Sequence, residues 1–200
     1  KTVMAKCKDK LTVQNKIKAM TIYVGFHGID AMKVLEKAVE NPDKTYRNAA
    51  LRASLAIPGK EIVSEWVRYF PKAIPDAKPE IIAILGERGD ESALALITSS
   101  LSDPDQKVRS EAAAALAAIS GSAAVPALIE YMKNSAGQPD QEAAKAALTS
   151  VSGNKEIALL KPLLIDGSSS AKKSAIELMA WNRGNEYFRE VLPFATSGDG

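Results

Sequence analysis

Cysteine and histidine are nearly absent from this sequence of 200 residues, in which Cys7 and His27 are the only residues of their kinds. One cysteine excludes an internal disulfide framework and any cysteine-rich zinc site. One histidine excludes sites that need a histidine pair, such as di-iron and histidine-rich zinc centres. Aromatic residues make up only 6%, and no apolar run approaches the roughly 18 to 20 residues of a membrane-spanning helix. These shortages favour a helical scaffold over a metal-based or thiol-based catalyst.

The overall composition is that of a soluble chain that can fold. Hydrophobic residues make up 46% and charged residues 25%, unlike the composition of a disordered tail. The length suits one ordinary domain or a short array of small repeating units. The chain begins at Lys1, and residues 2–10 look like the end of a helix, so we expect a piece of a longer polypeptide. A mature secreted or periplasmic chain is the alternative, which leaves the localisation open.

The dipeptide Pro-Asp recurs along the chain. Proline cannot continue a helix, and aspartate is a favourable N-cap for the next one. Each dipeptide is therefore expected to end one helix and to begin another, in internal repeats of two helices. The four copies are spaced by 33, 29 and 35 residues, at Pro42-Asp43, Pro75-Asp76, Pro104-Asp105 and Pro139-Asp140.

The period that starts at Asp105 shows the pattern most clearly. Apolar residues recur at steps of three and four over 106–119 and again over 123–133, which predicts two amphipathic helices. Gly121 lies between them and favours the left-handed conformation that ends a helix. Over the whole chain, the pattern predicts an all-α fold with about six helical hairpins in a single array over residues 1–200. The predicted units are 11–41, 44–74, 77–103, 106–138, 141–166 and 169–195, after a remnant of a preceding helix at 1–10.

The same period carries a more specific signature, at Asp105, Val108-Arg109, Ala112–Ala115 and Leu116. This signature resembles the HEAT repeat of the short bacterial type, which is also the PBS-lyase type. The second unit matches it at Asp43 and Arg47. The fifth unit keeps Asp140 but has no arginine at the matching position. The resemblance implies a right-handed α-α superhelix, an α-solenoid, in which such aspartate and arginine residues bridge adjacent repeats.

The aspartate and the arginine of a signature can also pair with each other. Asp43 precedes Arg47 by four residues, and Asp105 precedes Arg109 by the same interval. Residues four apart lie on one face of a helix, so each pair can couple across the first turn.

Catalytic residues cannot be assembled from this sequence in any familiar arrangement. The acidic residues fit helix caps or solvated faces, and His27 falls in an expected turn at Gly25–Gly28. The tripeptide Arg88-Gly89-Asp90 resembles an adhesion motif, but a glycine C-cap followed by an aspartate N-cap accounts for it better. We therefore predict that the protein is not an enzyme and uses no metal or cofactor.

The second helix of each hairpin is expected to line the concave face of the array, where a protein or peptide would bind. Side chains that lie off the apolar stripe of these helices are the binding candidates, since exposed tyrosine and arginine are favoured at interfaces. For Tyr69, packing against a neighbouring helix is an equally good interpretation. Trp66 and Trp181 are expected in the core. The candidates are Glu65, Arg68 and Tyr69 in the second unit, and Glu130, Tyr131 and Lys133 in the fourth.

Charge is distributed unevenly along the chain. Residues 1–60 carry a net charge of +7, residues 61–105 of −5, and residues 106–200 of zero. The basic end leaves nucleic-acid binding, as in repair glycosylases built from similar hairpins, as the alternative function. The absence of interleaved aromatic residues makes it the weaker choice. An accessory role like that of bilin lyases is a third possibility. We predict a monomeric scaffold for an unidentified protein or peptide, without a membrane span.

Overall fold

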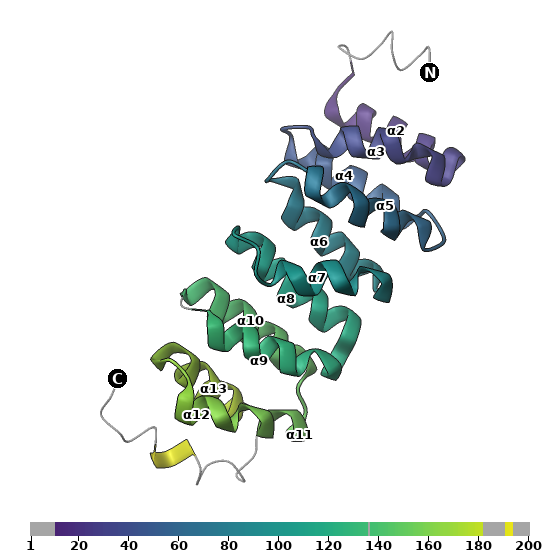
Figure 1. Cartoon of the computed structure of the whole chain (residues 1–200). Helices are drawn as coiled ribbons and strands as arrows, with labels where there is room; N and C mark the ends of the chain where they lie inside the picture. The colour runs from purple at the N-terminus through teal and green to yellow at the C-terminus, as the bar shows by residue number, and fades with distance from the viewer. Residues whose placement is uncertain (1–10, 136, 182–190, 194–200) are drawn as a thin grey trace. The chain divides into compact units, whose positions relative to one another are not determined.

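A computed structural model describes residues 11–135, 137–181 and 191–193 of the chain. Within these ranges all regular secondary structure is helical, and no strand occurs. The all-α class predicted from the sequence is therefore confirmed. The chain divides into two compact units, unit 1 with residues 1–93 and unit 2 with residues 94–200. Figure 1 labels the helices of both units.

Unit 1 is built from helices that are joined by short turns. The first hairpin has α2 and α3 on either side of a 3-10 turn, and α4 packs against both of these helices. The predicted remnant helix at 1–10, and Cys7 with it, lies outside the described residues. The elements are α2 (Val13–His27), η1 (Gly28–Ala31), α3 (Met32–Val39), α4 (Lys44–Leu55), α5 (Glu61–Tyr69), η2 (Phe70–Lys72), α6 (Ala77–Arg88) and η3 (Glu91–Ala93).

Unit 2 continues with the same kind of element. Here α8 packs on α7 and α10, and α10 packs in turn on α13. The second half of the last predicted unit, 169–195, falls largely outside the described residues. The elements are α7 (Leu94–Ser100), α8 (Gln106–Ser120), η4 (Gly121–Ala124), α9 (Val125–Asn134), α10 (Gln138–Val151), α11 (Asn154–Ile157), η5 (Ala158–Leu160), α12 (Lys161–Asp166) and α13 (Ser169–Trp181).

Aspartate caps begin the first helices of two repeats, as their local sequence predicts. Asp43 accepts hydrogen bonds from the backbone N–H groups of Thr45 and Tyr46, and Asp105 accepts one from Lys107. Both side chains satisfy donors that the first turn of a helix leaves unpaired.

The predicted N-cap at Asp140 is wrong. Helix α10 begins at Gln138 after Gly137, so Asp140 lies in its first turn. The reason is Pro139, because the first turn of a helix tolerates a residue without an N–H group. Displaced from the cap position, Asp140 is buried.

Two glycines with nearly the same backbone conformation end α2 and α8. The φ angle is 52° at Gly28 and 54° at Gly121, in the region that favours glycine. The turn expected at Gly25–Gly28 is therefore placed too early, because α2 continues through His27 before it ends.

The two tryptophans differ in exposure, although the sequence predicts both in the core. Trp66 is 1% exposed, and its indole N–H donates to Ser54 Oγ at 3.1 Å. Trp181 is 75% exposed, so that prediction is wrong. Trp181 ends α13 beyond Met179, the last buried residue of that helix.

One stretch of the described chain, Gln106–Asn134, is long and apolar enough to cross a membrane by length and composition. It contains α8 and α9 on either side of the turn η4, and 44% of its most apolar window is buried. Core helices of a repeat pass the same test, so this stretch is weak support for a membrane span.

Candidate functional site

Arg109 connects two consecutive repeats of unit 2. Its Nε and Nη2 atoms donate to the two carboxylate oxygens of Asp140, at 3.2 and 2.7 Å. Its Nη1 atom donates to the backbone carbonyls of Asp103 and Pro104, at 2.8 and 3.1 Å. A bidentate arginine–carboxylate pair fixes both distance and orientation, so Arg109 ties the turn before α8 to the start of α10.

Arg47 makes the same set of bonds in unit 1. Its Nε and Nη2 atoms donate to Glu80 at 2.9 and 3.0 Å. Its Nη1 atom donates to the carbonyls of Asn41 and Pro42, the turn before α4. Arg47 and Arg109 are thus directed at an acid of the next repeat, whereas the aspartates that precede them by four residues serve as N-caps.

Tyr131 belongs to the same cluster as Arg109. Its hydroxyl donates to Asp140 Oδ1 at 2.7 Å, and the residue is only 6% exposed. The prediction that Tyr131 faces solvent is therefore wrong. The side chain is buried because its hydroxyl forms a hydrogen bond with the buried carboxylate of Asp140. Burial, and then the hydrogen bond to Asp140, raise the pKa of the Tyr131 phenol.

Tyr69 is also buried, which corrects the prediction that it points away from the core. Its ring lies edge-on to the Trp66 ring, with 5.9 Å between the two ring centroids. Its hydroxyl donates to the Glu36 carbonyl of α3 at 3.3 Å and to Oε1 of Glu40, the residue after α3, at 3.4 Å. Burial, with the nearby Glu40 carboxylate, raises the pKa of Tyr69 to about 12. The other interpretation of Tyr69, that it packs against a neighbouring helix, is the one that agrees with the structure.

The four remaining candidates lie at or near the surface. In unit 1, Arg68 is exposed and pairs with Glu65 and with Glu36 of α3. In unit 2, Glu130 and Lys133 are exposed on α9, where Glu130 accepts a hydrogen bond from Asn134 at 2.9 Å.

A groove of about 640 Å³ opens beside the Arg109–Asp140–Tyr131 cluster; we call it the α7–α9 groove. Of the sequence candidates in unit 2, Glu130 and Tyr131 line it and Lys133 does not. The sequence did not predict the lining residues that α7 and the turn after it contribute. Ala127 was detectable from the sequence, because it is a small residue that lies off the apolar stripe of α9. The lining residues are Thr98, Leu101, Ser102, Arg109, Ala127, Glu130, Tyr131, Asn134, Ser135, Gly137 and Asp140.

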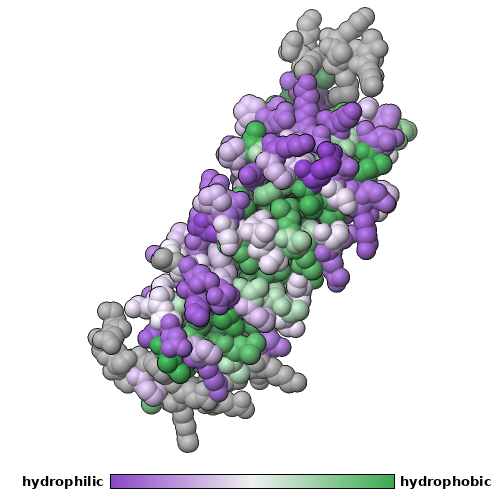
Figure 2. All heavy atoms as spheres, viewed as in Figure 1, coloured by the Kyte–Doolittle hydropathy of each residue, from purple (hydrophilic) through white to green (hydrophobic). Residues whose placement is uncertain are grey.

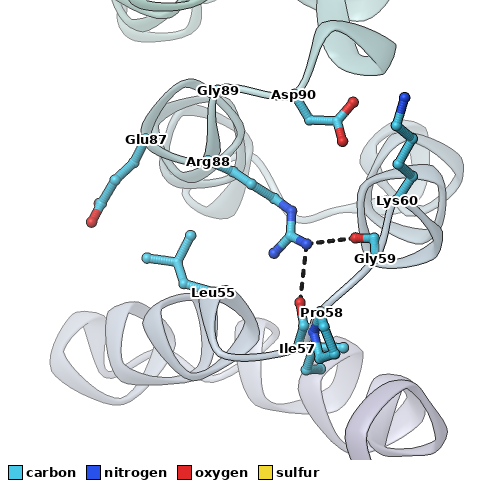
Figure 3. A pocket seen from close by; sticks show the side chains of 9 residues that line it. All are labelled: Leu55, Ile57, Pro58, Gly59, Lys60, Glu87, Arg88, Gly89 and Asp90. Carbon is cyan, nitrogen blue, oxygen red and sulfur yellow. Dashed lines mark hydrogen bonds between the residues drawn. The ribbon is translucent and has the colours of Figure 1, made fainter.

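A second cavity, of about 670 Å³, lies in unit 1 at the turns that follow α4 and α6 (Figure 3). Arg88 points into it, and its Nη2 atom donates to the carbonyls of Ile57 and Gly59. Gly89 has a φ of 73° and ends α6, and Asp90 Oδ1 accepts from the N–H and hydroxyl groups of Ser92. All three residues of the Arg-Gly-Asp tripeptide thus have structural roles.

Metal-ligating side chains do not gather anywhere in the described part of the chain. No group of three or more histidine, cysteine, aspartate or glutamate residues there could hold an ion.

Asp140 makes the stability of unit 2 depend on pH. Burial alone would raise the pKa of this carboxyl, but the hydrogen bonds from Arg109 and Tyr131 outweigh it and hold the pKa below its ordinary value. A depressed folded-state pKa adds stability above the unfolded value of about 3.9, and this stability is lost as the pH falls through the folded value. We therefore expect the difference in unfolding free energy between the wild type and Asp140→Asn to shrink below about pH 4.

Urea unfolding at pH 7, 5 and 3 measures this difference. A difference that stays the same from pH 7 to pH 3 would show that the Asp140 charge contributes nothing.

The stacked helical hairpins define a helical-repeat protein of the α-solenoid class, and the comparisons with known proteins agree. Residues 72–149 match the family model described as HEAT repeats, so the resemblance seen in the sequence is confirmed over this stretch. No curated protein sequence matches the chain. Among solved structures, the chain is similar to one in the complex of CpcE and CpcF of phycocyanin lyase from Nostoc sp. PCC7120. The TM-score is 0.52 at 20% identity, over 84% of this chain and 71% of that chain, which shows a shared fold.

Proposed function

We propose that the chain is a partner-binding module and that the α7–α9 groove holds a segment of another polypeptide. The observation that supports this most directly is the combination of an open groove with a floor fixed by Arg109, Asp140 and Tyr131. A binding surface whose side chains are already held in place loses less conformational entropy when a ligand binds.

The lining of the groove indicates what kind of segment it accepts. Leu101 and Ala127 offer apolar contact, and Thr98, Glu130 and Asn134 offer hydrogen-bonding groups around it. Polypeptide ligands combine apolar side chains with backbone N–H donors, which such a surface can meet. The exposed carboxylate of Glu130 favours a segment with a basic side chain or a free donor at that point.

A polypeptide suits this groove better than a nucleic acid. Nucleic-acid affinity depends on cations that are available to phosphates. Among the described residues that line the groove, Arg109 is the one cation, and it already donates from three nitrogen atoms to Asp140 and to two carbonyls. Glu130 adds a negative charge at the rim, which repels phosphate.

A role in protein binding also agrees with the comparison. The similar structure is a complex of two proteins, CpcE and CpcF, and both belong to a phycocyanin lyase. The similarity concerns the fold alone, so it does not assign the lyase activity to this chain. We propose a non-enzymatic role for it.

Peptide display against the whole chain tests the proposal. Peptides selected from a random library should bind the wild type, and Ala127→Trp should weaken their binding at least tenfold, about 1.4 kcal/mol, because the indole fills the groove. The matched control is Ala118→Trp, since Ala118 is an exposed alanine of α8 outside the groove lining.

Circular dichroism of both variants checks that they fold. Selected peptides that bind Ala127→Trp as tightly as Ala118→Trp would contradict the groove as the binding site, and a library without binders would contradict the function.

A further inference from the structure

Helix α2 presents an apolar face to solvent. Ile22 is 62% exposed and Phe26 is 85% exposed, and Ile29 of the following turn is 37% exposed. Ile22 and Phe26 are four residues apart in α2, so they lie on one side of the helix end. Green apolar surface also appears between purple polar side chains at the α2 end of unit 1 in Figure 2. An isolated exposed leucine or isoleucine needs no explanation, but a cluster with a phenylalanine does.

The repeat register shows what this face corresponds to elsewhere in the chain. Thr12 caps α2 and Asp43 caps α4, so the two helices can be aligned residue by residue from these caps. The equivalents of Ala19, Ile22 and Phe26 are then Ala50, Ala53 and Ile57. In the second repeat these positions are 0%, 8% and 2% exposed.

The same alignment holds for α8, which Asp105 caps and which has the same length as α2. Its equivalents are Ala112 and Ala115, which are 0% and 3% exposed, and Ile119, which is half-buried. The face that Ile22 and Phe26 leave exposed on α2 is thus buried on α4 and largely buried on α8.

The contacts of α4 show which neighbour closes this face. Arg47 and Arg52 of α4 reach the next repeat, at Glu80 and Glu87 of α6. At 100° per residue, Ala50 and Ala53 lie on the opposite side of α4, and α4 packs against the preceding helices α2 and α3. On α2, the equivalent side would meet a repeat that precedes it.

We propose that the face formed by Ala19, Ile22 and Phe26 is the docking surface for a further helical hairpin of this repeat type, encoded upstream of residue 1 on the same polypeptide. The surface is the equivalent, on α2, of the α4 face that packs against α2 and α3. A repeat array that ends at this point needs a polar outer face on its terminal helix, and α2 has an apolar one.

The size of the exposed side chains specifies the chemistry of the upstream hairpin. At the existing interface α4 contributes small residues, Ala50 and Ala53. On α2 the corresponding face carries the larger side chains Ile22 and Phe26, so the helix that packs on it must supply small residues or a groove that accepts Phe26.

Thiol labelling tests the proposal at matched positions. In a Cys7→Ser background, which removes the only cysteine, the probes are Ile22→Cys, its repeat equivalent Ala53→Cys as the buried control, and Ala56→Cys as the exposed control. Each is labelled with a maleimide in the 200-residue chain and in the native polypeptide that includes the upstream sequence.

In the 200-residue chain we expect Ile22→Cys to react at the rate of Ala56→Cys. In the native polypeptide its rate should fall roughly tenfold or more, towards that of Ala53→Cys, because a buried thiol reacts only after local opening. Equal rates for Ile22→Cys in the two proteins would overturn the proposal. Labelling of Ile22→Cys in the 200-residue chain that becomes slower as the protein concentration rises would also overturn the proposal. It would show that a second copy of the chain covers this face. Neither outcome affects the groove of unit 2.

Discussion

Replacement of Trp66 by alanine is expected to lower the free energy of unfolding of unit 1 by about 3 to 5 kcal/mol, the usual cost of a large-to-small change in a core. The side chain is 1% exposed, and its ring lies edge-on to that of Tyr69. Its indole N–H donates to Ser54 Oγ, which itself donates to the Leu51 carbonyl. The substitution therefore leaves a cavity and also removes a buried hydrogen bond.

Trp181→Ala is the matched control for this prediction, because it removes the other tryptophan of the chain. Trp181 is 75% exposed, so its loss should change the free energy of unfolding by no more than about 0.5 kcal/mol. Urea unfolding followed by circular dichroism compares the two without relying on tryptophan fluorescence. Similar losses for both variants would contradict the burial of Trp66 or the exposure of Trp181.

Replacement of Arg109 by methionine is expected to destabilise unit 2 by about 3 kcal/mol, in the range found when one partner of a buried ion pair is removed. Methionine keeps an unbranched apolar stem but leaves the Asp140 carboxylate, which is 8% exposed, without its charged partner. The carbonyls of Asp103 and Pro104 lose a donor as well.

Arg52→Met provides the control for Arg109→Met, since Arg52 pairs with Glu87 across a surface where both side chains are largely exposed. An exposed pair contributes roughly 0 to 1 kcal/mol. If Arg109→Met cost no more than Arg52→Met in urea unfolding, the cluster at Asp140 would not be the fixed floor that the proposed function needs.

Helices and caps could be predicted from the sequence because their causes are local. Asp43 and Asp105 bind N–H groups two or three residues away, so a short stretch of sequence contains both partners. The role of Asp140 could not be predicted in this way, because the proline of a Pro-Asp dipeptide can lie either before the helix or in its first turn.

The positions of the tyrosines could not be predicted in the same way. The apolar stripe of α9 places Tyr131 beside the core residues but does not show that a carboxylate of α10 lies within reach of its hydroxyl. The hydroxyl of Tyr69 likewise bonds to α3, a helix of the preceding repeat. The α7–α9 groove is lined by residues of four helices and their turns, so no single stretch of sequence contains it.

Backbone amide chemical shifts test the central claim most directly, in a titration of the labelled chain with a peptide selected by display. If the partner segment lies in the α7–α9 groove, the largest changes should occur at Leu101, Ala127 and Glu130. Changes concentrated instead at the turns around Gly59 and Gly89, or spread evenly over the helices, would contradict it.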